Sequence, residues 1–333
     1  MKKYDVYALG NALVDMEFEV SDQFLLDNGI EKGVMTLVDE DRQHELMCQL
    51  DAFEGNKASG GSAANTLIAV ACFGGSAFYS CRVSNDELGE FYMHDLHAAG
   101  VDSNLDGERP SGVTGKCLVM VTEDAERTMN TFLGISGSLD ASDLDEDAIR
   151  HSEYLYMEGY LVSSPTGKQA ALKAREIARQ AGVKIALTFS DPAMIEFFHD
   201  GLREMVGDGV DLLFCNQAEA LAYTGATTLD GAVDELKRIA RQFAITLGAE
   251  GALLYDGEQT VQIDPHPVKA VDSNGAGDMF AGAFLYGITH GKSFRQAGEL
   301  ASLASSRVVS QFGPRLPKEE HQFLLDMVEN TPQ

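Results

Sequence analysis

The sequence is poor in basic residues. It has 25 lysine and arginine residues against 52 aspartate and glutamate residues, which gives a net charge of −27 at neutral pH. No block of consecutive basic residues relieves this excess of negative charge. Nucleic acids and anionic membranes attract basic surfaces, so we expect the chain to bind neither of them.

The sequence also lacks the cysteine spacing of a disulfide framework or of a zinc site. Its cysteines are odd in number and widely spaced, with no C-x-x-C pair: Cys48, Cys72, Cys81, Cys117 and Cys215. The N-terminal segment reaches Asp5 before any apolar core of signal-peptide length. No apolar run reaches the roughly 18 residues of a membrane-spanning helix. We therefore expect a cytoplasmic protein.

Three common nucleotide and metal motifs are missing as well. No G-x-G-x-x-G follows the first expected strand, which argues against a dinucleotide site. The stretch GITHGKS (287–293) approaches a P-loop, but Tyr286 stands where that motif needs glycine. DLDEDA (143–148) has acids at EF-hand spacing, but Ala148 occupies the glycine position. We interpret these two stretches as a helix end and an acidic helix start.

What the sequence does contain is a regular alternation of short apolar strands with helices. We expect strands at residues 4–10, 76–83, 153–157, 183–189, 211–215 and 243–248, and helices at 62–73, 86–99, 165–181, 192–206, 217–223, 229–242, 275–290, 293–311 and 317–329. Such alternation is typical of βαβ units. The fold class is therefore α/β, with a mainly parallel central sheet between two layers of helices.

Two stretches do not follow this alternation. Residues 12–21 and 114–134 alternate apolar and polar side chains at period two, and the second folds back through a turn at 123–126. Strands without partner helices are expected outside the main sheet, in a small β-sheet lid. We assign residues 12–38 and 112–134 to the lid, and 1–11, 39–111 and 135–333 to one large domain.

The stretch DSNGAGDMFAGAF (272–284) combines two features that conflict for a simple anion site. Gly275, Ala276 and Gly277 open an apolar helix, and the backbone N–H groups of such a start attract phosphate. Asp278 follows at once, and its carboxylate would repel a resting anion. In phosphoryl transfer the N–H groups stabilise the migrating group and the carboxylate accepts the proton of the attacking hydroxyl. Alternatively, Asp278 only complements the helix dipole, worth about 0.3–1 kcal/mol.

These residues resemble the ribokinase-like (PfkB) family of carbohydrate and nucleoside kinases. DSNGAGD is similar to the family's D-T-x-G-A-G-D signature, with Ser273 in place of threonine, and SGGSAANTLIA (59–69) to its N-terminal Gly-Gly signature. GNALVDM (10–16), NQAEA (216–220) and TLGAEGALL (246–254) match further family motifs in the same order. The resemblance covers nearly the whole chain.

The resemblance implies a role for each matching residue. Asp278 would be the base, Gly275, Ala276 and Gly277 the anion hole, and Asn216 and Glu219 would organise Mg²⁺ and the phosphates, Glu219 through water. Thr246, Gly248 and Gly251 would line the ATP site. Some family members also hold a monovalent cation such as K⁺ near the GAGD stretch, and the sequence does not establish one here.

The expected acceptor is a purine nucleoside. The stretches GNALVDM, GGSAANT and DSNGAGD, with Asn274 before GAGD, are most similar to the adenosine-kinase branch of the family. Asp15 suits a vicinal diol, with Gly60, Gly61 and Asn65 completing a ribose pocket, and Asn11 would bond the base. Tyr160 would stack on the purine or lie in the core, and Cys117 and Leu133 would line the pocket or pack inside the lid. Arg127 would reach the transferring phosphate or be a solvated charge.

Three alternatives to an adenosine-phosphorylating enzyme remain open. The first is a sugar kinase of the same family, acting on ribose, fructose or a related sugar. The second is a nucleoside-binding regulator without catalysis, and the third an oxidoreductase, which would have to bind NAD(H). Lid strands can pair between subunits in this fold, and the sequence does not distinguish a monomer from a homodimer.

Overall fold

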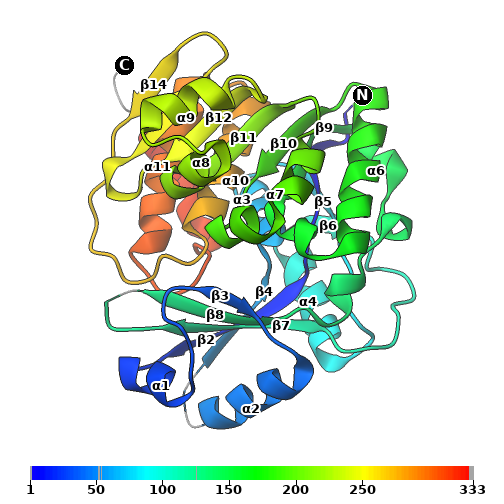
Figure 1. Cartoon of the computed structure of the whole chain (residues 1–333). Coiled ribbons are helices and arrows are strands. Elements are labelled where there is room, and N and C mark those ends of the chain that lie inside the picture. Colours follow the sequence, from blue (N-terminus) through cyan, green and yellow to red (C-terminus); the bar gives the residue numbers. More distant parts are fainter. Residues whose placement is uncertain (1, 52, 54, 125, 330–333) are drawn as a thin grey trace.

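The computed structural model describes residues 2–51, 53, 55–124 and 126–329, and a nine-stranded sheet forms its centre (Figure 1). Seven strands pair in parallel: β6 (Val101–Ser103), β5 (Ala77–Ser80), β1 (Tyr4–Leu9), β9 (Ser152–Glu158), β10 (Lys184–Thr188), β11 (Val210–Asn216) and β12 (Ala240–Thr246). Beyond β12, β13 (Ala252–Tyr255) and β14 (Thr260–Ile263) continue the sheet antiparallel. The expected mainly parallel sheet is confirmed.

Helices bury both faces of this sheet. Side chains along β1 alternate between two hydrophobic cores, with Val6 and Ala8 in one and Tyr7 and Leu9 in the other. The first core packs against α3 (Ser62–Cys72), α4 (Glu87–Ala98), α10 (Ala276–Thr289), α11 (Phe294–Val309) and α12 (Lys318–Glu329). The second packs against α5 (Glu146–Arg150), α6 (Pro165–Ala181), α7 (Pro192–Val206), α8 (Gln217–Thr224) and α9 (Leu229–Leu236). The domain therefore has three layers.

One expected helix is too long. The helix predicted over 229–242 ends at Leu236, and β12 begins at Ala240 instead of 243. Ala240 pairs with Val210 of β11 and is buried, so pairing with the sheet outweighs the helical periodicity of this stretch. Among the described helices, none has the length and apolar composition needed to cross a membrane.

A second sheet of five strands, here called the lid, packs below the carboxyl ends of the central strands (Figure 1). Its order is β3 (Met35–Leu37), β8 (Arg127–Phe132), β7 (Gly115–Val121), β2 (Leu13–Glu19) and β4 (Gly55–Gly60). The helices α1 (Asp22–Asp27) and α2 (Glu40–Leu50) cover its outer face. Along β2, Val14 and Met16 point to these helices, whereas Leu13 and Asp15 face the central domain.

The domain boundaries given above stay a prediction. β4 pairs with β2 in the lid, although residues 39–111 were assigned to the large domain. The turn expected at 123–126 includes residue 125, which lies outside the described residues, as do residues 330–333 of the large domain's last segment. The hairpin itself forms, since β7 and β8 pair antiparallel from Lys116 and Phe132 to Val121 and Arg127.

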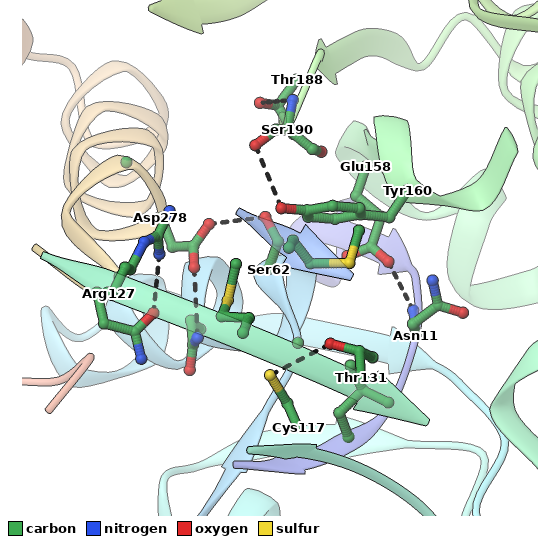
Figure 2. Close-up of a pocket in the computed structure, with 18 of the residues that line it drawn as sticks. Asn11, Ser62, Cys117, Arg127, Thr131, Glu158, Tyr160, Thr188, Ser190 and Asp278 are labelled. Atoms are coloured by element: carbon green, nitrogen blue, oxygen red, sulfur yellow. Dashed lines mark hydrogen bonds between the residues drawn. The ribbon is translucent and has the colours of Figure 1, made fainter. Parts of the chain in front are cut away.

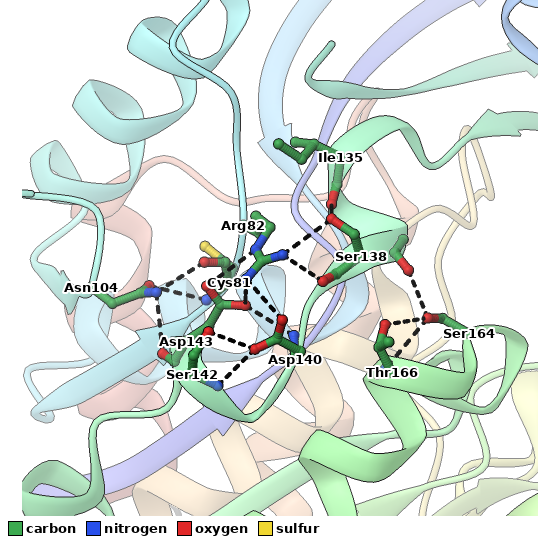
Figure 3. Close-up of polar contacts among 12 residues, drawn as sticks. Cys81, Arg82, Asn104, Ile135, Ser138, Asp140, Ser142, Asp143, Ser164 and Thr166 are labelled. Carbon is green, nitrogen blue, oxygen red and sulfur yellow. Dashed lines mark hydrogen bonds and ion pairs between the residues drawn. The ribbon is translucent and has the colours of Figure 1, made fainter. Parts of the chain in front are cut away.

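Arg82 fixes the chain where it returns from the lid to the central sheet (Figure 3). Its guanidinium donates to the carbonyl of Ser138 at 2.6 Å and pairs with Asp143 at 2.8 Å and Asp140 at 3.3 Å. These partners follow β8 in the chain, whereas Arg82 follows β5. The connection from the lid to the central domain is therefore tied to the segment that follows β5.

Candidate active site

A cavity of about 240 Å³ lies between the carboxyl ends of the central strands and the inner face of the lid. This is where open parallel sheets usually bind ligands. Residues at the ends of four neighbouring strands line it: Glu158, Thr188, Asn216 and Thr246. Figure 2 shows Asp278 and Arg127 on one side of the cavity and Asn11 and Thr131 on the other. The cavity therefore joins distant parts of the sequence.

The anion hole expected at the start of α10 opens into this cavity. Gly275 has φ 71°, and a Cβ there would lie 2.4 Å from the carbonyl oxygen of Pro314, so only glycine fits. Gly277 lines the cavity, with open space where a side chain would be. N–H groups in the first turn of a helix have no partner within the helix. The start of α10 can therefore offer donors to a phosphoryl group.

Asp278 lies in the first turn of α10 and is held from α3. Its carboxylate accepts hydrogen bonds from Ser62 Oγ at 2.7 Å and Asn65 Nδ2 at 3.3 Å. Burial raises the pKa of Asp278, and these hydrogen bonds together with the charges of Arg127 and Arg315 oppose that rise. A carboxylate fixed beside helix N–H groups can accept a proton from a hydroxyl placed between them.

Asp15 faces the cavity from the lid strand β2. It is 6% exposed, and among the described residues its carboxylate has no hydrogen-bond partner. Burial, and then the nearby Glu17, raises the pKa of Asp15 to about 8. A Cβ on Gly60 would lie about 2.1 Å from this carboxylate, so the glycine permits its close approach. A buried acid without a partner is suited to receive ligand hydroxyls.

Arg127 connects the lid to the segment before the anion hole. Its Nη1 donates to Asn274 Oδ1 at 2.9 Å, and Asn274 Nδ2 donates to Glu17 Oε1 at 3.0 Å. Arg127 and Asn274 both line the cavity. The arginine is thus half-buried and directed towards the anion hole, not solvated at the end of its strand.

Asn216 and Glu219 cap the start of α8 together. Glu219 accepts from the backbone N–H of Asn216 at 3.0 Å and from its Nδ2 at 2.9 Å, while Asn216 Oδ1 accepts from the N–H of Glu219 at 2.8 Å. Glu219 is 4% exposed, and burial raises its pKa to about 7. In the described part of the chain, no three acidic, histidine or cysteine residues cluster as metal ligands. Mg²⁺ keeps most of its ligands as water and phosphate oxygens and needs only one or two from protein, so the oxygens of Asn216 and Glu219 fit it.

The lid supplies an apolar wall to the cavity. This apolar lid wall consists of Leu13, Met35, Leu37, Cys117, Met129 and Leu133. Cys117 Sγ accepts a hydrogen bond from Thr131 at 3.3 Å. Opposite, Tyr160 lines the cavity and its hydroxyl donates to the carbonyl of Ser190 at 3.4 Å, a residue held at φ 73°. Tyr160 is therefore at the cavity rather than deep in the core.

Most of the predicted site residues line this one cavity: Asn11, Asp15, Gly61, Asn65, Cys117, Arg127, Leu133, Tyr160, Asn216, Glu219, Thr246, Asn274, Gly275, Gly277 and Asp278. Four predicted residues do not line the cavity: Gly60, Ala276, Gly248 and Gly251. Gly248 and Gly251 belong to the turn between β12 and β13, next to Thr246. The roles of all these residues stay predictions.

Glu158 is the main residue that the sequence patterns missed. It is fully buried at the end of β9 and accepts the backbone N–H groups of Asn11 at 2.7 Å and Ala63 at 2.8 Å. It thus joins the two loops that carry the acceptor motifs, and burial raises its pKa to about 7. Ser62 was also missed. An acid that ends the apolar strand YLYME was the available signal for Glu158.

Comparisons with known proteins agree with the resemblance. The model of the pfkB family carbohydrate kinases matches residues 34–321. The structure of an adenosine kinase from Sinorhizobium meliloti superposes with a TM-score of 0.92 at 37% identity, covering 98% of this chain and 99% of that one. A probable sugar kinase from Rhizobium etli CFN 42 has the same TM-score at 34% identity, covering 98% of this chain and 100% of that one. The adenosine kinase of Saccharomyces cerevisiae is 27% identical over 94% of this chain and 96% of its own length.

Proposed function

The chain belongs to the pfkB family of carbohydrate kinases and is a phosphotransferase acting on an alcohol group, and from this premise we propose that its acceptor is a purine nucleoside. The reaction is transfer of the γ-phosphoryl group of ATP to the 5′-hydroxyl of adenosine, giving AMP and ADP. The resemblance to adenosine kinases supports this choice.

One observation carries the proposal: the cavity pairs an apolar wall with a buried acid that has no partner. Six apolar side chains of the lid face the same space as Asp15. A nucleoside presents a flat base, which gains from burial against apolar surface, and a ribose diol, which can donate two hydrogen bonds to one carboxylate. A free monosaccharide carries hydroxyls on most sides, so it would bury little apolar surface against the apolar lid wall.

Asp278 accepts the proton of the 5′-hydroxyl as that oxygen attacks the γ-phosphorus. The N–H groups of Gly275, Ala276 and Gly277 and the guanidinium of Arg127 stabilise the charge on the transferring phosphoryl oxygens. Asn216, Glu219 through water, and Thr246 hold the nucleotide side of the cavity. Bound Mg²⁺ would neutralise the phosphate oxygens and so permit a carboxylate this close to them. Closure of the lid excludes water that would otherwise hydrolyse ATP.

A sugar kinase is the second candidate, and one match favours it. The Rhizobium etli protein described as a probable sugar kinase covers the chain as completely as the Sinorhizobium adenosine kinase does. In this case Asp15 and Glu158 would bind sugar hydroxyls, and Asp278 would keep its role. The cytoplasmic location and a place in purine salvage stay predictions under either candidate.

An acceptor panel tests the proposal. Purified protein with ATP and Mg²⁺ is incubated with adenosine, inosine, guanosine, cytidine, ribose or fructose, and each product is identified by mass. We expect AMP from adenosine at the highest kcat/KM. A phosphorylated sugar with no nucleotide product would replace the proposal by the sugar kinase, and binding of adenosine without turnover would favour a regulator.

A further inference from the structure

Arg315, in the segment between α11 and α12, donates hydrogen bonds to three elements. Its Nε donates to Asn65 Oδ1 of α3 at 3.1 Å, its Nη1 to Asp95 of α4 at 2.9 Å, and its Nη2 to Ser59 Oγ of β4 at 3.0 Å. Its side chain is 18% exposed. In the described structure Arg315 does not line the cavity, so it does not touch a ligand bound there.

The bond from Arg315 determines which way the amide of Asn65 faces. Asn65 is 6% exposed on α3, and its two amide atoms have different partners. Oδ1 accepts from Arg315, which directs Nδ2 to Asp278 at 3.3 Å. A flipped amide would place a donor against the guanidinium and an acceptor against the carboxylate, and both contacts would be repulsive.

The segment that carries Arg315 also contacts the anion hole. The carbonyl of Pro314 lies against Gly275, where a Cβ would be only 2.4 Å away. The N–H of Gly313 donates to Asp272 at 2.9 Å, and Asp272 in turn accepts the N–H of Asn274 at 2.8 Å. Residues 313–315 therefore touch both the start of α10 and the residue that holds Asp278 from α3.

We propose that Arg315 is a positioning residue for phosphoryl transfer, which acts through Asn65 to hold the carboxylate of Asp278 in line with the acceptor hydroxyl. The inference rests on the proposed role of Asp278 as the base. Asp95 is the anchor of this relay, since it holds Nη1 of Arg315 and also accepts the N–H and hydroxyl of Ser59. The relay thus runs from α4 through Arg315 and Asn65 to Asp278.

A double-mutant cycle tests the relay. kcat is measured at saturating ATP and acceptor for the wild type, Arg315→Met, Asn65→Ala and the double variant, on the alkaline plateau of the pH profile. There Asp278 is fully ionised, so a change in its pKa no longer affects the rate. We expect each single variant to lose about 10- to 100-fold in kcat. If Arg315 acts through Asn65, the double variant falls no more than about threefold below the slower single variant. Multiplying losses would overturn the proposal.

Arg315→Lys separates orientation from charge. Lysine keeps a positive charge near Asp95 but has no second donor arranged to hold Asn65. The other charged groups facing Asp278 are Arg127 from β8, Asp15 from β2 and Glu158 from β9, and they are unchanged. We expect Arg315→Lys to lose kcat on the alkaline plateau as Arg315→Met does. Only Arg315→Met should move the acid limb of the pH–rate profile, where kcat falls as Asp278 is protonated, to higher pH, because it removes the charge that lowers the pKa of Asp278. Normal plateau kcat in Arg315→Lys would overturn the proposal.

Arg82→Met is the matched control for general loosening. The Arg82 side chain is also 18% exposed and also bonds several partners, but those partners lie outside the cavity (Figure 3). It should lower thermal stability and leave plateau kcat and the acid limb in place; an equal loss of kcat would show that the Arg315 effect is not specific. If Arg315→Met does not fold, Arg315→Lys replaces it in the cycle.

The activity of the wild type shows whether this inference or the proposed function has failed. A wild type that phosphorylates only sugars overturns the nucleoside proposal, and the cycle is then run with that sugar, because Asp278 serves either acceptor. An active wild type with independent losses from Arg315 and Asn65 overturns only the relay. A wild type that transfers phosphate to no hydroxyl acceptor overturns both.

Discussion

The two walls of the cavity differ in how they are built. The domain wall (Ser62, Asn65, Glu158, Asn216, Glu219 and Asp278) is polar, and its members bond one another or the backbone. The bonds of Asp278 and Glu158 join elements far apart in the chain, whereas Asn216 and Glu219 bond each other within one helix start. The apolar lid wall holds its side chains by packing along neighbouring strands. Under the proposed function, the chemistry takes place at the domain wall and the lid selects the acceptor.

Two charged lid residues that line the cavity are exceptions to this division: Arg127, for which we propose a role in the chemistry, and Asp15. Asp15 also differs from the acids of the domain wall. It is an acid on a lid strand, next to Leu13 along the cavity face of β2, and it has no hydrogen-bond partner among the described residues. The acids of the domain wall are satisfied before any ligand binds, whereas Asp15 is satisfied only when a ligand donates to it. Under the proposed function, Asp15 therefore couples acceptor binding to the lid.

Asp278→Asn tests the domain wall and should have the largest effect. An amide keeps the size of the side chain but cannot accept the hydroxyl proton, so kcat should fall about 10²–10⁴-fold with every accepted acceptor. Adenosine binding, measured by calorimetry, should be retained. Asp140→Asn, a carboxylate of the Arg82 cluster outside the cavity, is the control and should turn over normally. Near-normal turnover in Asp278→Asn would show that Asp278 is not the base.

The sequence predicted the parts of this comparison that depend on local pattern. The strand and helix alternation, the lid hairpin and the motif residues all follow from short stretches, and most of those residues meet in one cavity. β4 was missed because GNKASG has little intrinsic preference for a strand and pairs only because β2 lies beside it. Arg315 was missed because its partner Asn65 is 250 residues away. Contacts of this kind leave no local pattern.

Leu133→Ala tests the apolar lid wall. Loss of the leucine side chain should raise KM for adenosine about tenfold, because apolar contact with the base is lost, and should leave kcat within about twofold. Leu26→Ala, on the helix α1 that covers the outer face of the lid, is the matched control, since Leu26 is 72% exposed. A fall in kcat without a rise in KM would mean that the lid wall serves the chemistry and not the choice of acceptor.

The smallest expected effect comes from Asp15, and it is an effect on stability rather than on rate. Burial and Glu17 raise the pKa of Asp15 to about 8 in the folded protein, far above the value of about 3.9 for an unfolded chain. Between these two values the folded protein binds a proton that the unfolded chain has released, so the free energy of unfolding falls as pH rises towards about 8. The ligand-free wild type should therefore melt at a higher temperature at about pH 5.5 than at about pH 8.

Asp15→Asn should remove this part of the pH dependence, because the amide never ionises. At about pH 8 the variant should melt at least about 2 °C above the wild type, while losing affinity for adenosine. The charges that face Asp15, namely Glu17, Arg315, Asp278 and Arg127, stay in the variant. Its formal net charge changes only from −27 to 25 − 51 = −26, so its melting temperature still falls with pH but less steeply. Parallel melting curves for the two proteins would mean that Asp15 does not bear this cost. The adenosine affinity of Asp15→Asn tests the lid separately: an unchanged affinity would mean that Asp15 does not bind the acceptor and that the apolar lid wall does.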